Sequence, residues 1–240
     1  MSLDDIKKRA QEILDIVNGM LPPPPEEIIV TPSNYKEKLR NISNVSFTEF
    51  DNYVRVSASA VRLELPCTYQ NVEISCKARI VEEGSNQNYL LQLYGRGGHH
   101  STNYPCDGSA YKGRFRRTSA TIVKEVEHPC YTENRSEIRR EMYESIVGRW
   151  CEYKVVIFNS PDNSVVTAAY LDDQAKAMYK DVGEWATSST AFKDNCPALQ
   201  FGNNGFRQRD EILNKAGSLV AFRSDGGTIW EFEYLKARKL

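Results

Sequence analysis

Hydrophobic and polar residues alternate along most of the chain from about residue 45 onwards. In segment 71–81 the apolar positions that share one face are Val72, Ile74, Cys76, Ala78 and Ile80. The positions between them are polar or charged, and a period of two is typical of strands that bury one face. Similar patterns recur in 88–96, 118–127, 150–158, 164–171, 218–223 and 228–236. These segments predict an all-β protein.

Turn signals separate some of these segments. Pro161-Asp162-Asn163 and Asp225-Gly226-Gly227 each lie between two strand patterns, so each predicts a hairpin. No alternation of strand and helix patterns appears, which argues against a parallel sheet. Short strands with one apolar and one polar face indicate packed antiparallel sheets. We therefore expect an antiparallel β-sandwich of the jelly-roll kind over residues 45–240.

The first 44 residues follow a different pattern. Apolar residues at spacings of three and four, from Leu3 to Met20, predict an amphipathic helix over residues 1–21. Pro22 to Pro25 end that helix, and 22–44 is interpreted as a Pro-rich linker and lead-in. The helix either docks on its own domain or forms a homo-oligomer through residues 3–20.

Composition and charge narrow the classes of partner. The formal net charge is −1, which argues against attraction of the whole protein to nucleic acid. No apolar run reaches the roughly 18 residues that a membrane span needs. We expect an extracellular or cell-surface location, although the first residues lack the apolar stretch of a secretory signal.

The six cysteines include no CxxC pair, and their pairing stays open. Cys76 and Cys151 occupy apolar positions of strand patterns, so we expect them to be buried. Cys106 and Cys130 fall in expected loops, where they either bridge or stay free. Together with the histidines they offer nitrogen and sulfur ligands, but their spacings match no compact zinc module.

The segment 92–131 carries the most candidate chemistry. It holds all three histidines, His99, His100 and His128, and a local surplus of basic residues interleaved with tyrosines. Arginine can grip a carboxylate through two hydrogen bonds, and tyrosine rings offer flat faces to sugars. Gln92, Tyr94 and Arg96 alternate, so they are expected to line one column of a sheet face.

Several motifs resemble those of a known superfamily. The stretches QNVEISCKARI, NYLLQLYGRGGHH, GRWCEYKVVIFN and TIWEFEYLKAR resemble laminin-G-like members of the concanavalin A-like lectin/glucanase superfamily. RGGHH, PCDGSAYKGRF and KEVEHP are similar in particular to largely archaeal members. The resemblance covers roughly residues 45–240. It implies a ligand groove on the outward face of a concave sheet and, in many members, a bound calcium ion, for which Asp172-Asp173 is the candidate.

Two enzymatic alternatives follow from these residues. A polysaccharide lyase needs a group that neutralises a carboxylate, a base and an acid. Arg96 or Gln92 could neutralise, a histidine could be the base, and Tyr94 or Tyr111 could donate. A glycoside hydrolase needs two carboxylates, and Glu125 and Glu127 share a face, although Val126 departs from the ExDxE motif of laminarinase-type glucanases.

We therefore expect a carbohydrate-recognising protein that binds a polysaccharide, in our interpretation an acidic one, on its concave sheet. Whether it also cleaves the sugar stays open. The expected catalytic residues are His99, Tyr111, Glu125 and His128, and the expected ligand-binding residues are Gln92, Tyr94, Arg96, His100, Lys112 and Glu127. The alternative is a fibre, coat or appendage subunit that assembles through its N-terminal helical arm.

Overall fold

Two antiparallel sheets packed face to face form the body of the protein. The computed structural model describes residues 26–40, 44–86, 89–97, 109–127, 131–142, 144–183 and 212–240. The predicted helix 1–21, the proline run and the proposed oligomer contact lie outside these residues. The fold class predicted from the alternation, an all-β antiparallel sandwich, is confirmed.

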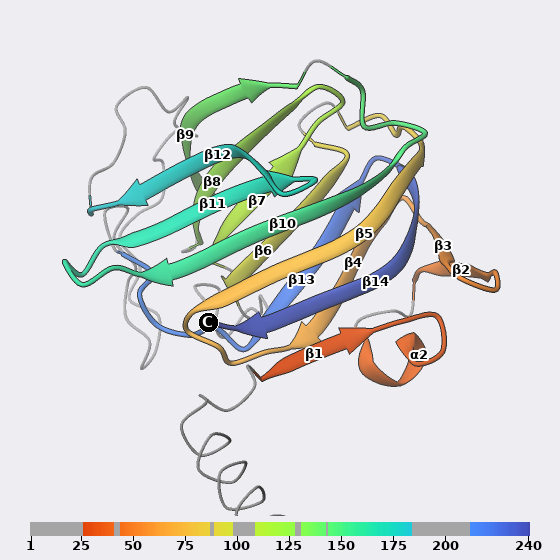
Figure 1. Ribbon diagram of the computed structural model, residues 1–240, viewed down its shortest axis with the longest axis horizontal. Helices are drawn as coiled ribbons and strands as arrows, with labels where there is room; N and C mark the ends of the chain where they lie inside the picture. The colour runs from red at the N-terminus through yellow and green to blue at the C-terminus, as the bar shows by residue number, and fades with distance from the viewer. Residues whose placement is uncertain are drawn as a thin grey trace, which may run out of the picture.

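One layer is an eight-stranded sheet, called sheet A, which lies nearest the viewer in Figure 1. Its strands run in the order β12-β11-β10-β5-β14-β3-β2, and β1 pairs with β14. Their bounds are β1 Glu27–Val30, β2 Ser46–Glu49, β3 Val54–Ser57, β5 Val72–Glu82, β10 Trp150–Asn159, β11 Val165–Leu171, β12 Gln174–Asp181 and β14 Ile229–Lys239. A short helix, α2 (Tyr35–Lys38), follows β1 and packs Tyr35 into the core.

The second layer is a six-stranded sheet, called sheet B, in the order β4-β13-β6-β7-β8-β9. Its strands are β4 Ala60–Pro66, β6 Leu91–Gly97, β7 Ala110–Phe115, β8 Ser119–Glu127, β9 Tyr131–Glu141 and β13 Leu219–Asp225. Figure 1 shows this sheet behind sheet A. β1, which falls within the predicted lead-in 22–44, pairs with β14 of sheet A.

The core lies between the two sheets and follows from the period of two. Residues from alternate positions of β5, among them Ile74, Cys76 and Ala78, are fully buried there. They meet aromatic residues of β14 and β10, including Trp230, Phe232 and Tyr153. Burial of these side chains removes large apolar areas from water and holds the layers together. Cys76 and Cys151 are both buried and free, so the prediction of burial is confirmed.

One predicted hairpin is wrong. The strands on either side of Asp225-Gly226-Gly227 do not pair, because β13 lies in sheet B and β14 in sheet A. Gly226 and Gly227 adopt φ values of 71° and 83°, which favour glycine, and the chain crosses there from one layer to the other. The other hairpin is confirmed, because β10 and β11 pair on either side of Pro161-Asp162-Asn163.

Candidate functional site

The outward face of sheet B brings several of the predicted site residues together. Leu91 and Leu93 of β6 point into the core, so Gln92 and Tyr94 between them point outward. Across the ladder, Gln92 is paired with Arg114 and Tyr94 with Lys112, both on β7. Gln92 and Tyr94 therefore share a face, as predicted. The pairing with β7 adds two basic residues, Arg114 and Lys112, to that face.

Neighbouring strands extend this cluster on both sides. On β13, Arg223 lies opposite Gln92, and on β4 Arg62 lies opposite Arg223. We call the resulting set the polar face, which consists of Arg62, Glu64, Tyr89, Gln92, Tyr94, Lys112, Arg114, Glu125, Arg223 and Asp225. Four of its side chains are cationic and three are carboxylates. Alternation alone, applied to β4, β7 and β13, would have put Arg62, Glu64, Arg114, Arg223 and Asp225 on this face as well.

Ion pairs order most of the charges on the polar face. Arg62 lies 2.6 Å from Glu64, Arg223 lies 2.9 Å from Asp225, and Lys112 pairs with Glu125. Tyr89 donates its hydroxyl hydrogen bond to Asp225. These contacts fix the charged groups in place before any ligand arrives, which lowers the ordering cost of binding.

Tyr94 lies at the centre of the polar face, between two cations. Arg62 lies over its ring at 5.5 Å from the centroid, and the ammonium nitrogen of Lys112 lies at 5.2 Å. Burial raises the pKa of Tyr94 above its ordinary value, an effect that outweighs the opposing influence of Arg62 and Arg223. Its hydroxyl is therefore protonated at neutral pH.

The side-chain amide of Gln92 is only half satisfied, because its oxygen has a hydrogen-bond partner and its nitrogen has none. Arg114 donates from Nε to Gln92 Oε1 at 2.7 Å. Because a guanidinium only donates, this contact fixes the oxygen of the amide toward Arg114 and directs Nε2 elsewhere. Nε2 has no hydrogen-bond partner, and Gln92 is 0 % exposed. A buried donor without an acceptor costs about 1–3 kcal/mol, so this N–H destabilises the fold as it stands.

Exposure differs strongly across the polar face. Gln92 and Lys112 are nearly inaccessible, at 0 % and 3 % exposure, so the accessible groove expected from the alternation is not open at these two residues. The side chains of Arg62, Arg223 and Asp225 remain 26 %, 35 % and 21 % exposed. Solvent therefore reaches the polar face from β4 and β13. Lys112 carries a lowered pKa because burial disfavours its charge, although Glu125 opposes that effect.

Arg96 does not continue the column of Gln92 and Tyr94. Its φ is 62°, and the ladder between β13 and β6 shifts register beside it. This left-handed conformation turns the side chain away, so that Nη1 donates to Leu213 O at 2.7 Å and Nε to Gln70 O at 3.0 Å. Burial lowers the pKa of Arg96 to about 10. The prediction that Arg96 lies in one column with Gln92 and Tyr94 is therefore wrong.

Tyr111 points into the sandwich rather than onto the polar face, because Lys112 beside it points outward. Its hydroxyl donates to Asp181 Oδ2 at 2.6 Å, and the Leu213 backbone N–H donates to it at 3.2 Å. Lys124 Nζ lies 2.7 Å from the same carboxylate, and both side chains are 0 % exposed. Tyr111 thus belongs to an interior polar cluster and lies apart from Glu125.

The remaining predicted site residues fall in other parts of the chain. His99, His100 and His128 lie outside the described residues, as do Cys106 and Cys130. Glu127 is the last residue of β8, where its backbone pairs with Tyr131, but its side chain lies outside the described part. The described residues therefore carry Gln92, Tyr94, Lys112 and Glu125 of the predicted site on one face.

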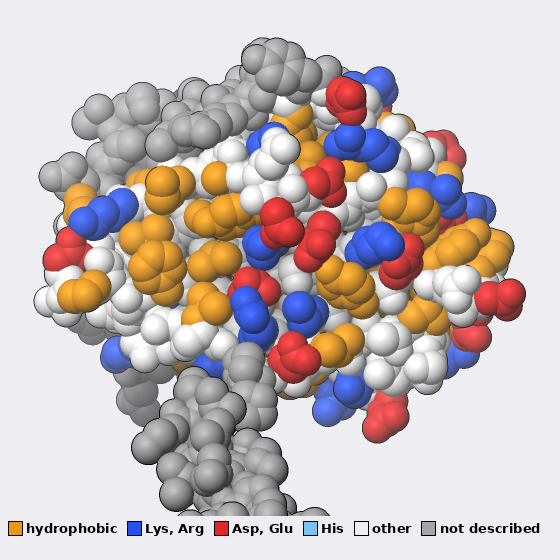
Figure 2. All heavy atoms as spheres, in the orientation of Figure 1, with side chains coloured by type: hydrophobic (Ala, Val, Ile, Leu, Met, Phe, Trp, Pro, Cys, Tyr) orange, Lys and Arg blue, Asp and Glu red, His pale blue; other side chains and the backbone are white. Residues whose placement is uncertain are grey.

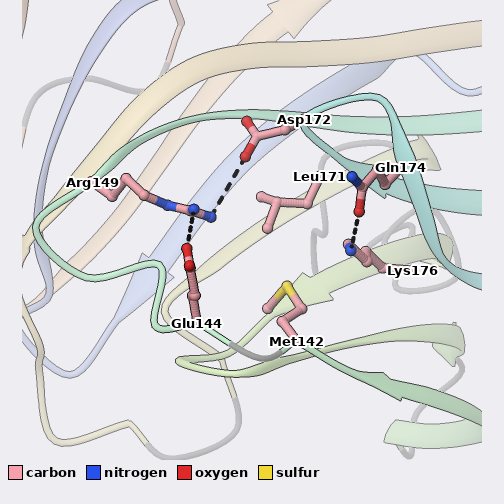
Figure 3. Close-up of a pocket in the computed structure, with 7 residues that line it drawn as sticks. All are labelled: Met142, Glu144, Arg149, Leu171, Asp172, Gln174 and Lys176. Carbon is pink, nitrogen blue, oxygen red and sulfur yellow. Dashed lines mark hydrogen bonds and ion pairs between the residues drawn. The ribbon is translucent and has the colours of Figure 1, made fainter.

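The candidate calcium residues are already paired with cations. Asp173 lies 2.5 Å from Lys154, and Asp172 lies 3.5 Å from Arg149 and accepts a hydrogen bond from the backbone N–H of Glu152. Arg149 also contacts Glu144 across a small pocket beside the β11–β12 turn (Figure 3). No group of three potential metal ligands occurs among the described residues. A calcium ion at Asp172-Asp173 would have to displace both cations, so these residues do not fit it.

Among the described residues, no helix is both long and apolar enough to span a membrane. No protein-family model matches the chain, and no curated protein matches it in sequence.

Solved structures of similar fold have low sequence identity to this chain. The β-glucanase of Bacillus licheniformis is 12% identical, with 92% of this chain and 100% of that chain covered and a TM-score of 0.47. The endo-β-1,4-glucuronan lyase of the fungus Trichoderma reesei is 9% identical, with 85% and 91% covered and a TM-score of 0.46. A legume lectin-like domain of Entamoeba histolytica is 7% identical, with 88% and 94% covered and a TM-score of 0.43.

These neighbours are of the concanavalin A-like lectin, glucanase and lyase kind that the sequence resembles. Nothing in them supports the archaeal part of that resemblance. At these identities the similarity concerns the fold and carries no conclusion about the site.

Proposed function

We propose that the protein binds an acidic polysaccharide on the polar face of sheet B. The observation that carries this proposal is the unpartnered Nε2 of Gln92, which lies in a row with Arg114 and Arg223. All three side chains present donors, so none of them can satisfy the N–H of another. Because Gln92 is 0 % exposed, binding requires the surface over it to open; a uronate carboxylate would then supply the missing acceptor and bring a negative charge to the guanidinium groups of Arg114 and Arg223.

The arginines of the polar face support an acidic ligand. Arg62, Arg114 and Arg223 carry planar guanidinium groups, which can bind a carboxylate through two hydrogen bonds. Arg62 and Arg223 are partly exposed where solvent reaches the face, and they would meet the ligand first. Electrostatic attraction of this kind weakens as salt screens it.

The described groups favour binding over cleavage. Elimination needs a base that is unprotonated at neutral pH, whereas burial raises the pKa of both Tyr94 and Tyr89. Hydrolysis needs one free acid and one free carboxylate, whereas Glu64, Glu125 and Asp225 each contact a cation on the polar face. We therefore propose a lectin-like role for these residues.

Calorimetric titration with hexasaccharides of polyglucuronate, alginate and polygalacturonate tests the proposal. Gln92→Glu removes the N–H donors and adds a carboxylate that would repel a uronate, while the side-chain volume stays nearly the same. We expect the affinity for the hexauronate that binds to fall at least about tenfold, a change of about 1.4 kcal/mol. Thermal stability should stay the same or rise, since a buried orphan donor is lost.

Gln174→Leu is the matched control, because Gln174 lies on β12 of the other sheet and bonds only Lys176 among the described residues. It should leave uronate binding unchanged. Equal affinity of wild type and Gln92→Glu for every uronate would refute the proposal. A rise in ultraviolet absorbance during incubation with these polymers would show elimination and overturn the lectin-like role.

A further inference from the structure

A second pocket lies on the opposite side of the molecule, on the outward face of sheet A. Three separate segments line it: the β1–α2 connection, the turn between β2 and β3, and β14. The lining residues are Ile29, Thr31, Pro32, Ser33, Asp51, Asn52, Glu233, Tyr234 and Lys236. Its volume of about 820 Å³ lies within the range of small-molecule sites. Figure 2 views the molecule from this side, where acidic, basic and hydrophobic side chains intermingle.

Tyr234 provides the aromatic ring in the lining of this pocket. Its hydroxyl donates to Glu152 Oε1 at 2.9 Å. Tyr234 is on β14 and Glu152 on β10, and Lys77 of β5 lies between them in the same row of the ladder. The Tyr234 side chain therefore extends from β14 toward β5 and Glu152. This hydrogen bond fixes the position of the ring, and Tyr234 is only partly buried.

The walls are held by contacts of their own. In the β1–α2 connection, Asn34 Oδ1 accepts from the Thr31 backbone N–H at 2.8 Å, and the hydroxyls of Thr31 and Ser33 are 2.9 Å apart. In the turn between β2 and β3, the Phe50 N–H donates to Tyr53 O at 3.0 Å, and the two rings stack at 4.4 Å. The pocket is thus preformed, which lowers the cost of binding.

The wall groups that face solvent are polar and balanced in charge. Glu233 is neutralised by Lys77, 2.8 Å away. This leaves the Asp51 carboxylate, the Asn52 amide and the Lys236 ammonium, and Asp51 and Asn52 are exposed on the turn. Lys236 Nζ lies 5.9 Å from the centroid of the Tyr234 ring. One negative and one positive group give no preference for a charged ligand, but they offer both acceptors and donors.

From this arrangement we infer that the pocket is a second ligand site, specific for a neutral oligosaccharide. Sugar rings present apolar C–H faces that rest on an aromatic ring, and their hydroxyls both donate and accept hydrogen bonds. A ring of the ligand lies on Tyr234, and its hydroxyls reach Asp51 and Asn52. The site differs from the polar face in sheet, in charge and in ligand, and it does not depend on the function proposed there.

Calorimetric titration of the full chain with neutral hexasaccharides tests this inference. The probes are laminarihexaose, cellohexaose, xylohexaose, mannohexaose and maltohexaose, each up to about 10 mM, a range that covers weak sites. Tyr234→Leu removes the aromatic ring and should weaken binding of the hexasaccharide that binds about tenfold. Asp51→Ala, in an exposed turn that keeps its backbone hydrogen bond, should weaken it about five- to tenfold.

Two control variants assign the binding to this pocket and to the ring of Tyr234. Tyr234→Phe keeps the ring and should bind within about threefold of wild type, since only the contact to Glu152 is lost. Gln92→Glu on the polar face should leave neutral-sugar binding unchanged. Failure of all five sugars to bind overturns the inference, and so does binding that neither Tyr234→Leu nor Asp51→Ala weakens. Either result leaves the acidic-polysaccharide proposal to its own test.

Discussion

The hydroxyl of Tyr111 donates a hydrogen bond to the carboxylate of Asp181 inside the sandwich, at 2.6 Å. The same hydroxyl accepts from the backbone N–H of Leu213 at 3.2 Å. Tyr111 therefore joins the end of β12 to the segment that leads into β13. Buried polar groups of this kind hold a fold in register when all their partners are present.

Removal of this hydroxyl should destabilise the protein without affecting ligands. We expect Tyr111→Phe to lower the free energy of unfolding by about 1–3 kcal/mol, because it leaves a buried N–H and part of a carboxylate unsatisfied. Urea unfolding followed by tryptophan fluorescence measures this change. Tyr170→Phe, on the outward face of β11, is the control and should change the value by less than about 0.5 kcal/mol. An equal effect of both substitutions would contradict the structural role of Tyr111.

The ion pair between Lys124 and Asp181 has both side chains 0 % exposed. Lys124→Met alone leaves a buried carboxylate without its cation, and we expect a loss of about 3–5 kcal/mol. When Asp181→Asn is added, the second change should cost less than it does in the wild-type background, since no charge is then left behind. Chemical denaturation of the single and double variants gives the coupling. Additive losses would argue against a direct pair.

Glu231 lies between two arginines on sheet A and is itself 0 % exposed. Arg55 and Arg79 each donate from two nitrogens to one of its oxygens. Glu231→Gln should therefore cost about 1–3 kcal/mol, a value limited by the exposure of the two arginines. Glu233→Gln, whose partner Lys77 is 44 % exposed, should cost only about 0–1 kcal/mol in the same thermal melts. The reverse order would refute this ranking.

Acid should destabilise the protein as three surface carboxylates become protonated. Hydrogen bonds from Lys36, Lys180 and Lys154 lower the pKa values of Glu49, Asp162 and Asp173, respectively. The unfolded chain then binds more protons than the folded one. The stability is fully present above the ordinary values of 4.5 for Glu49 and 3.8 for the aspartates, and it is lost as the pH falls through the lowered values.

Urea midpoints measured from pH 7 down to pH 2 test this expectation. The fall should be smaller in about 0.5 M salt, because all three carboxylates are at the surface and are screened. Lys180→Met should remove the part of the fall that belongs to Asp162. A midpoint that stays constant down to pH 2 would contradict it.

The alternation of residues was enough to predict the architecture and part of the polar face. The period of two assigned the buried face of β5 correctly and put Gln92 and Tyr94 on a common face of β6. The prediction failed at Arg96. This residue adopts positive φ between two glycines, and there side chains no longer alternate regularly between the two faces of the strand. The alternation also predicted no strand for the segment of Lys112 and Arg114, whereas these residues belong to β7, a central strand of sheet B.

Long-range pairing could not be predicted from local signals. Asp225-Gly226-Gly227 has the composition of a hairpin turn, but a turn sequence does not determine whether the flanking strands pair with each other. The strand partners of β13 are β4 and β6, and those of β14 include β5 and β3, all far away in the sequence. The register that puts Arg223 beside Gln92 depends on this crossing, and so does the unpartnered amide.

The crossing at Gly226 and Gly227 also has a consequence for how the protein folds. The strand before it separates β4 from β6, and the strand after it separates β5 from β3. Neither layer can close until residues 219–240 have been inserted into both. Assembly from such distant contacts is slow, so on the ribosome the native sandwich should form only after residues 219–240 have been synthesised and released from the exit tunnel.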